Sequence, residues 1–340
     1  MTINFGTFLK DYLEDNNISE KEFSNRIDIT PQYLNGILNG KKNLSKETII
    51  AISLVTDIET DMIMDIESNY QIECAINRYL DHNHLTIDKY LNKFNFKYLK
   101  DNKIIDFLNI DDKSRCLKDI LKYLRVSNPE QIEKLTNKTL YKSKNDKPEL
   151  LALWLEMCYR DFLKQNIAEY KSKNIDSLVA YIKEEASKNS FNQTNLIKKF
   201  NELGVGLVIK DDLPNSKIRG AFRVYNKIPV IFITTKYKRI ADIYFTLLHE
   251  IAHLKSDYNT AQAKSVISYD DKGHELKTDK LAFNWMVEDS YYNHIKNDKT
   301  YDIEKEKTYP KSFIVYRLAQ DNIIKYNSKI YQKYNIIIKL

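Results

Sequence analysis

The chain has 340 residues and a formal net charge of +6, with 29% charged and 43% hydrophobic residues, a composition typical of a soluble globular protein with two or three domains. No run approaches the ~18 apolar residues of a membrane-spanning helix, the first residues lack a signal-peptide pattern, and Cys74, Cys116 and Cys158 lie too far apart in sequence to form a disulfide framework. These features exclude a membrane-spanning or disulfide-stapled protein and predict reduced thiols and a cytoplasmic location.

Residues 1–66 are predicted to form a domain of five short helices. The apolar residues of "FGTFLKDYL" recur at the three- and four-residue steps of an amphipathic helix. Ser19, Thr30 and Ser45 each precede a helical stretch and are expected to cap it, and Gly40 is expected to end the third helix. The fifth helix, "TDMIMDIESNYQIECAINRYL", is expected to run to about residue 80.

The stretch "ISEKEFSNRIDITPQYLNGILNGKKNLSKETIIAIS" resembles an XRE-type helix-turn-helix domain, whose third helix enters the major groove of double-stranded DNA. In the resemblance, Gln32 is placed to read adenine, and the lysines after the third helix are placed to hold phosphates. The residues expected to contact operator DNA are Thr30, Gln32, Tyr33, Asn35, Lys41 and Lys42.

The charge of this domain opposes DNA binding. Six basic and eleven acidic side chains give residues 1–66 a net charge of −5, although the stretch 30–46 holds three lysines and no acid. A helical bundle that serves only dimerisation or partner contact is therefore the alternative interpretation.

Residues 67–200 are predicted to be a helical connecting or dimerisation region. Polar breaks are expected at "VSNPEQ" and "YKSKNDKPE", and the aromatic-rich "LLALWLEMCYRDFL" is expected to be a helix. The stretch "ETDMIMDIESNYQIECA" resembles the helix that follows the helix-turn-helix in HigA-type antitoxins. That resemblance implies a DNA-binding regulator, usually a homodimer, with a possible toxin partner.

Residues 201–340 are predicted to be a small α+β domain. The stretches "GVGLVIK" and "GAFRVYNKIPVIFITT" are short, β-branched and bounded by turns, which favours strands. Two helices are expected next, "FTLLHEIAHLKSDY" and "ELKTDKLAFNWMVED". The stretch from 312 onward could be a helix followed by irregular chain or by a strand.

The first of these two helices carries His249, Glu250 and His253 in an H-E-x-x-H spacing. Residues four apart share one face of a helix, so both imidazoles can bind one metal ion. Glu250 points elsewhere along the same turn and can act as general base on a water activated by the metal, as in a zinc peptidase. The alternative is a core helix with two satisfied histidines.

A third ligand must come from the following helix. Glu275 is the best candidate, and Asp279, one turn further on, is expected to orient one of the ligating imidazoles. His274 is the rival third ligand. The alternative for Glu275 and Asp279 is a solvated first helical turn, where acids are favoured in any case.

The stretch "GAFRVYNKIPVIFITTKYKRIADIYFTLLHEIAH", followed by "ELKTDKLAF", resembles the ImmA/IrrE family of zinc metallopeptidase domains. The resemblance implies a zincin-like fold, one bound Zn²⁺ and Glu275 as the third ligand. A peptide substrate could then add as an extra strand beside "PVIFITT".

The predicted fold class is therefore mainly α with a small α+β domain: a five-helix helix-turn-helix domain at 1–66, a helical middle at 67–200, and a zincin-like domain with a small β-sheet at 201–340. The predicted function is a DNA-binding transcriptional regulator whose zinc peptidase cleaves a protein partner. The alternative is an antitoxin-like repressor of a toxin-antitoxin or mobile-element operon, whose metal domain is catalytically silent and serves binding or sensing.

Overall fold

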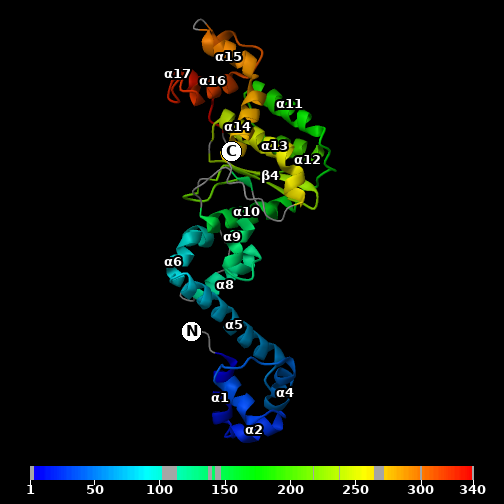
Figure 1. Cartoon of the computed structure of the whole chain (residues 1–340), viewed down its shortest axis with the longest axis vertical. Helices are drawn as coiled ribbons and strands as arrows, with labels where there is room; N and C mark the ends of the chain where they lie inside the picture. The colour runs from blue at the N-terminus through cyan, green and yellow to red at the C-terminus, as the bar shows by residue number, and fades with distance from the viewer. Residues whose placement is uncertain are drawn as a thin grey trace. The chain divides into compact units, whose positions relative to one another are not determined.

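The chain folds into two compact units, both mainly helical, as the computed structural model shows (Figure 1). The first unit comprises Met1–Asn92 and Ile105–Pro129, and the second comprises Lys93–Ile104 and Glu130–Leu340. The structure describes residues 4–101, 113–136, 140–141, 147–216, 218–236, 238–263, 272–298 and 301–338.

The first unit begins with five helices in the expected order. They are α1 (Phe5–Asp15), α2 (Glu20–Arg26), α3 (Pro31–Leu38), α4 (Lys46–Thr56) and α5 (Thr60–His82). The side chains of Ser19, Thr30 and Ser45 each accept a hydrogen bond from a backbone amide in the helix that follows, which confirms the predicted caps. Gly40 has a φ of +66° just beyond α3, the left-handed conformation that commonly ends a helix at glycine.

A small apolar core holds these helices together. Its most deeply buried members include Phe5, Leu9, Phe23, Leu34, Ile52 and Ile63. Helices α1 and α3 approach so closely that a Cβ atom on Gly6 would lie 2.0 Å from the carbonyl oxygen of Ile37. The contact tolerates only glycine, so it fixes α3 against α1 and leaves the opposite face of α3 exposed to solvent.

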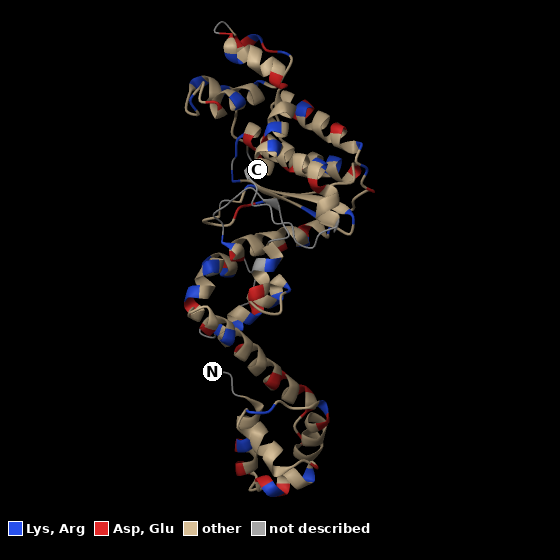
Figure 2. Cartoon of the chain, in the orientation of Figure 1, with Lys and Arg blue, Asp and Glu red and all other residues tan. Residues whose placement is uncertain are grey.

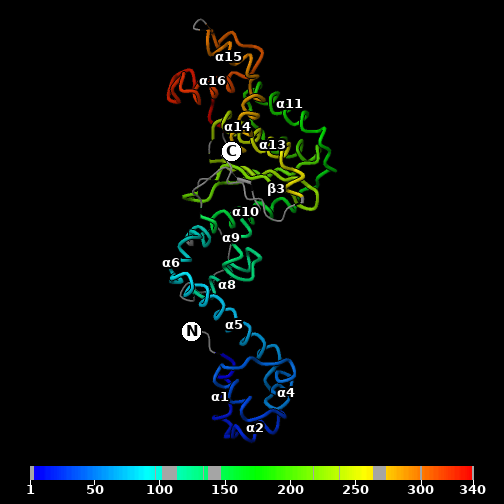
Figure 3. The backbone as a smooth tube through the Cα atoms, viewed as in Figure 1, coloured from blue at the N-terminus to red at the C-terminus, as the bar shows by residue number. Residues whose placement is uncertain are grey.

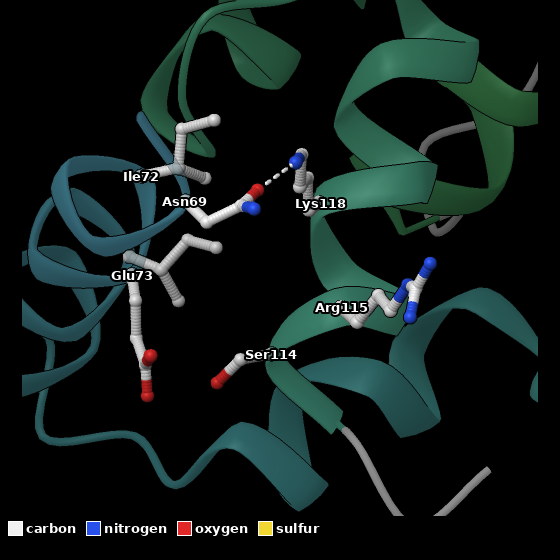
Figure 4. A pocket seen from close by; sticks show the side chains of 7 residues that line it. Asn69, Ile72, Glu73, Ser114, Arg115 and Lys118 are labelled. Atoms are coloured by element: carbon white, nitrogen blue, oxygen red, sulfur yellow. Dashed lines mark hydrogen bonds between the residues drawn. The ribbon is translucent and has the colours of Figure 1, made fainter. Parts of the chain in front are cut away.

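Beyond its first turns, α5 runs on as a long helix (Figure 3) and packs against α8 (Lys113–Leu124). The unit also contains α6 (Ile87–Leu91). A polar cavity of about 230 Å³ lies between α5 and α8. Figure 4 shows the ammonium group of Lys118 donating a hydrogen bond to the side-chain oxygen of Asn69, which ties the two helices together.

The second unit is built on a four-stranded sheet with the strand order β1–β3–β4–β2. Its strands are β1 (Leu140–Tyr141), β2 (Gly206–Lys210), β3 (Gly220–Tyr225) and β4 (Ile228–Thr234). Strand β3 is antiparallel to β1 and β4, and β2 is parallel to β4. The strands predicted from the sequence are confirmed, but β4 lies between β3 and β2. Because both of its edges are paired, the expectation that a substrate adds beside "PVIFITT" is wrong.

Helices cover both faces of this sheet. Trp154 of α10 (Pro148–Phe162) meets Phe232 of β4 edge to face, at 6.2 Å between ring centroids. Ile231 and Ile233, whose side chains alternate with that of Phe232, belong to the core beneath α13 (Ile240–Ala263). Figure 1 shows α10 on one side of the sheet and α13 with α14 (Lys272–Met286) on the other.

The remaining helices complete the second unit. They are α7 (Phe96–Asp101), α9 (Glu130–Thr136), α11 (Asn174–Ser187), α12 (Gln193–Glu202), α15 (Asp289–Asn297), α16 (Lys311–Gln320) and α17 (Lys329–Tyr334), with 3₁₀ turns at Asn92–Phe94 and Ile303–Lys305. The expected break at "VSNPEQ" separates α8 from α9, whereas most of "YKSKNDKPE", at 142–146, lies outside the described residues. The stretch from 312 onward continues α16, contains α17 and then becomes irregular, with an isolated bridge between Arg239 and Ile337 in the described part.

The division of the chain differs from the predicted one. Residues 147–200 were expected to belong to a connecting region, but α10 and α12 pack directly on the sheet and α11 packs on α13. The buried apolar residues of α11 and α12 belong to the core that includes α13, and this long-range packing is not visible in local periodicity.

Charge and cysteine placement follow ordinary rules. Figure 2 shows that the strands of the sheet are almost free of charged residues, whereas both charge signs are interspersed along the helices. Cys116 and Cys158 are buried, Cys74 is half-buried, and the three form no disulfide in the described chain. Among the described residues, no helix is both long and apolar enough to cross a membrane.

Candidate metal centre and nucleic-acid interface

Helix α13 carries the H-E-x-x-H residues along its buried face. His249, Glu250 and His253 are each only 1% exposed. The start of the helix is held by residues from far along the chain: the side-chain oxygen of Asn335 accepts a hydrogen bond from the amide of Ala241 at 2.9 Å, and this side chain is fully buried. The helix is therefore anchored two turns before its first histidine.

Helix α14 brings Glu275 to the two imidazoles. The Nε2 atoms of His249 and His253 lie 3.1 Å apart, and the Glu275 carboxylate oxygens lie 3.5 Å from the first and 3.4 Å from the second. A tetrahedral ion with bonds of ~2.0–2.1 Å separates its ligand atoms by ~3.3–3.4 Å. Each imidazole thus lies near one oxygen of the Glu275 carboxylate, and the three residues are close enough together to be candidate ligands of one metal ion. We call these three residues the metal cage.

A carboxylate stands behind each imidazole of the cage. Asp279 lies 2.9 Å from Nδ1 of His249, and Asp257 lies 2.8 Å from Nδ1 of His253. The contact of Asp257 is a hydrogen bond, and a donating Nδ1–H leaves the Nε2 lone pair of His253 available to a cation. The contact of Asp279 is within ion-pair distance of His249 but is not a hydrogen bond. The sequence indicated Asp279 for this orienting position but missed Asp257, which lies one turn beyond His253 on α13.

The protonation equilibria of the cage are strongly perturbed. Burial acts to lower the pKa of His253, but hydrogen bonds to Asp257 and Glu275, with nearby carboxylate charges, raise it to about 9. Burial acts to raise the pKa of Glu275, but the two imidazoles hold it well below its usual range. The cage therefore favours positive charge at its centre, which either a proton or a divalent cation can supply.

A second set of potential ligands, His253, Asp257 and His274, overlaps the first. Its spacing differs, because Asp257 Oδ2 lies 2.8 Å from His253 and 2.9 Å from Nε2 of His274, both ordinary hydrogen-bond distances. In this arrangement Asp257 already accepts from both rings. His274, the rival third ligand, thus contacts Asp257 and is not a member of the cage.

Glu250 lies beside the cage without belonging to its donor triangle. It points toward β3, where a Cβ atom added to Gly220 would lie 2.5 Å from the Glu250 carboxylate. The absence of a side chain at Gly220 therefore makes room for this carboxylate. The strand sequence "GAFRVY" does not indicate this role of Gly220, because the contact depends on how the strand crosses α13.

The residues expected to contact DNA gather around α3. Thr30, Gln32, Asn35, Lys41 and Lys42 are exposed, whereas Tyr33 is half-buried and donates a hydrogen bond from its hydroxyl to the carbonyl of Asn43 at 3.1 Å. Thr30 caps the helix and Tyr33 bonds the loop that follows it, so both side chains have structural roles. The side-chain oxygen of Asn35 accepts a hydrogen bond from Asn39 at 3.1 Å, and Gln32 remains a candidate for contacting base edges.

The comparisons with known proteins bear on this first unit. Residues 9–63 match the family model of a helix-turn-helix domain. No match was found among curated proteins or solved structures. The helix order, the caps and the family match together show an XRE-type helix-turn-helix at the N-terminus, and the chain is accordingly a DNA-binding transcription regulator.

Proposed function

We propose that this DNA-binding regulator carries a zinc-dependent peptidase in its second unit, which hydrolyses a peptide bond in a protein partner. One observation carries the proposal: the Nε2 atoms of His249 and His253 lie 3.1 Å apart, and each lies within 3.5 Å of one oxygen of the Glu275 carboxylate, with Glu250 next to His249 on the same helix. This donor set and an adjacent general base are what metal-assisted amide hydrolysis needs.

In the proposed mechanism, His249, His253 and Glu275 hold the ion, while Asp257 and Asp279 fix the two imidazoles. Zn²⁺, when bound, lowers the pKa of water to ~7 and polarises the scissile carbonyl. Glu250 accepts a proton from the attacking water on a carboxylate oxygen and delivers it to the amine nitrogen of the leaving peptide. The absence of a side chain at Gly220 leaves room for that carboxylate.

The first unit would bring this activity to an operator. Helix α3 would enter the major groove with Gln32 on base edges, while Lys41 and Lys42 would hold phosphates. A homodimer would place two such helices on two half-sites. A repressor, or a regulator linked to stress or to a toxin, is the expected class of protein partner.

A second candidate function has its own support. His249, Glu250 and His253 are almost completely buried, and the side chain of Glu275 is only 26% exposed. A buried ion of this kind could hold the fold together and serve toxin binding or sensing in an antitoxin-like repressor, without turning over a substrate.

The substitution Glu250→Gln separates the two functions. Zinc-loaded wild-type protein is incubated with a proteome-derived peptide library, and new N-termini are counted by mass spectrometry. Because Glu250 is the proton carrier, Glu250→Gln is expected to retain zinc and to lose about 100-fold or more in cleavage rate. Glu202→Gln, at an exposed position on α12, is the matched control and is expected to cleave normally.

Two results would reject the peptidase. One is undiminished cleavage by Glu250→Gln, which would point to a contaminating protease. The other is a zinc-loaded wild-type protein that cleaves nothing, which would favour the buried ion of the second candidate.

A further inference from the structure

A cavity in the second unit shares no residue with the metal cage. It has a volume of about 290 Å³, far more than the ~30 Å³ of one water molecule. We call it the α16 pocket, because the first residues of α16 form part of its wall. Its lining residues are Ala186, Ser187, Asn189, Glu306, Lys307, Tyr309, Pro310, Lys311, Ser312 and Tyr334.

The N-terminus of α16 opens onto this pocket. The helix spans ten residues, begins after Pro310, and has no hydrogen bond from a capping side chain among the described residues. The first amides of a helix have no partner within the helix, and the helix dipole makes this end attractive to anions. A capping group is therefore missing at the place where Lys311 and Ser312 line the pocket.

The hydroxyl of Ser312 is an independent sign of a ligand. Ser312 is only 3% exposed, and its oxygen has no hydrogen-bond partner among the described residues. Buried hydroxyls in folded proteins are nearly always paired, since an unpaired one loses its bonds to water without replacement. At the second position of α16, this hydroxyl belongs to the helix turn whose first amides would bind an anion.

The charges around the pocket suit an anion. Lys307 and Lys311 supply positive charge, although the ammonium group of Lys311 also donates to the carbonyl of Glu304 at 2.6 Å and lies 5.4 Å from the ring centroid of Tyr334. Glu306 opposes an anion, but its carboxylate is already occupied: it accepts from the amide of Tyr309 at 3.0 Å and from the hydroxyl of Tyr291 at 2.8 Å, and the amide of Thr308 and the hydroxyl of Tyr301 also donate to it. These donors leave the first turn of α16 as the free anion-binding element of the wall.

We propose that the α16 pocket binds a small phosphate monoester, with its phosphate on the first amides of α16 and the hydroxyl of Ser312. The aromatic rings of Tyr309 and Tyr334 line the remaining space and would contact the organic part of the ligand. Such a ligand would act on this regulator as an effector, at a place separate from both the metal cage and α3.

Calorimetric titration of the zinc-loaded full chain with inorganic phosphate tests the proposal, with chloride at the same ionic strength as the reference. Ser312→Ala is expected to weaken phosphate binding about tenfold, because it removes a hydrogen bond to a charged group. Ser187→Ala is the matched control: this serine also lines the pocket, but its hydroxyl already donates to the carbonyl of Lys183 at 2.9 Å. Its phosphate affinity is expected to stay unchanged.

AMP serves as the second probe, because it adds an aromatic ring to the phosphate. We expect AMP to bind more tightly than inorganic phosphate. Equal affinities would overturn the role of Tyr309 and Tyr334 and reduce the ligand to inorganic phosphate.

Two outcomes would overturn the pocket itself: no heat of binding with millimolar phosphate or AMP, or equal affinities in wild type and Ser312→Ala. If Ser312→Ala fails to fold, Lys307→Gln at an exposed position replaces it and is expected to weaken phosphate binding. Zinc content and cleavage should be unchanged in all these variants, so these measurements test phosphate binding in the pocket independently of the proposed peptidase activity.

Discussion

Asp257 determines how one imidazole of the metal cage is presented. Its Oδ2 atom lies 2.8 Å from Nδ1 of His253 and is 2.9 Å from Nε2 of His274. The first contact sets the tautomer that leaves Nε2 of His253 available to a metal. The second contact holds Asp257 in place, so His274 acts on the cage through Asp257.

This arrangement predicts different effects for two neighbouring substitutions. Asp257→Asn is expected to weaken zinc binding by about tenfold or more, because the amide holds the imidazole less firmly and adds no negative charge. His274→Ala is expected to change zinc affinity much less. Competition with a chromophoric chelator measures both affinities.

Similarly large losses of zinc affinity in both variants would identify the alternative ligand set of His253, Asp257 and His274. In that case His274→Ala would abolish zinc binding, whereas Glu275→Gln would leave it intact. Near-complete loss in Glu275→Gln is the result expected of the metal cage.

At the residue scale, the sequence predicted the part of the site that local helical geometry dictates. His249, Glu250 and His253 follow from the spacing of four residues on one helix, and Glu275 follows from its place on the next helix. Gly220 could not be predicted, because its role depends on a strand crossing α13. Asp257 has the same helical spacing from His253, so its signal was present in the sequence.

At the element scale, helix α13 depends on a distant cap. The side chain of Asn335 accepts from the amide of Ala241, and its amide group donates to Asp242 at 3.2 Å and to the hydroxyl of Tyr331 at 2.8 Å. The amide of Ile240 also donates to the carbonyl of Ile336 at 3.0 Å. The first turn of α13 is therefore held by residues almost one hundred positions later.

Replacing this cap is expected to loosen the helix. Asn335→Ala removes a helix cap and leaves buried partners without their hydrogen bonds, so the free energy of unfolding should fall by about 2 kcal/mol. Denaturant unfolding of the metal-free protein measures the change. Asn327→Ala, at an exposed position nearby, is the control, and an equal loss in both variants would contradict the capping role.

Helices and strands were more predictable than their pairing. The caps at Ser19, Thr30 and Ser45 and the strand sequences before α13 are local signals, and all of them appear in the structure. The central place of β4 is a long-range property, because it depends on the parallel pairing of β2 with a strand that follows it by eighteen residues or more. The two-residue strand β1 is too short to leave a periodic signal.

At the scale of the whole molecule, the net negative charge of the helix-turn-helix domain repels DNA and opposes binding. Residues 1–66 carry a net charge of −5, so affinity should depend on the few lysines beyond α3. The rest of the chain is basic, but no DNA contact is predicted there. The helix-turn-helix match at residues 9–63 lies in the acidic part of the chain.

Replacing Lys41 and Lys42 tests whether these lysines contact DNA phosphates. The double substitution Lys41→Ala and Lys42→Ala is expected to lower the slope of log affinity against log salt by about 2, since each phosphate contact contributes ~0.9. Fluorescence anisotropy with a mixed-sequence duplex over a range of salt concentrations gives the slope. Lys10→Ala, at an exposed position on α1, is the control, and an equal change there would indicate a general charge effect.

The division into two units was predicted only in part. The sequence separated the helix-turn-helix from the rest by its caps and spacing, but it placed residues 147–200 in a connecting region. The aromatic helix α10 shows why: Trp154 is completely buried against Phe232, and a buried helix has apolar residues on every side, so its sequence does not reveal its partner.

The hydrogen bonds between residues 335–338 and the start of α13 can form only late in translation. When the ribosome has made both histidines and Glu275, the segment that completes the first turn of α13 has not yet been synthesised. A nascent chain at that stage contains every ligand but lacks the hydrogen bonds that hold them in register. We therefore expect a polypeptide that ends before residue 335 to contain the helix-turn-helix domain but to lack the hydrogen bonds that hold the first turn of α13.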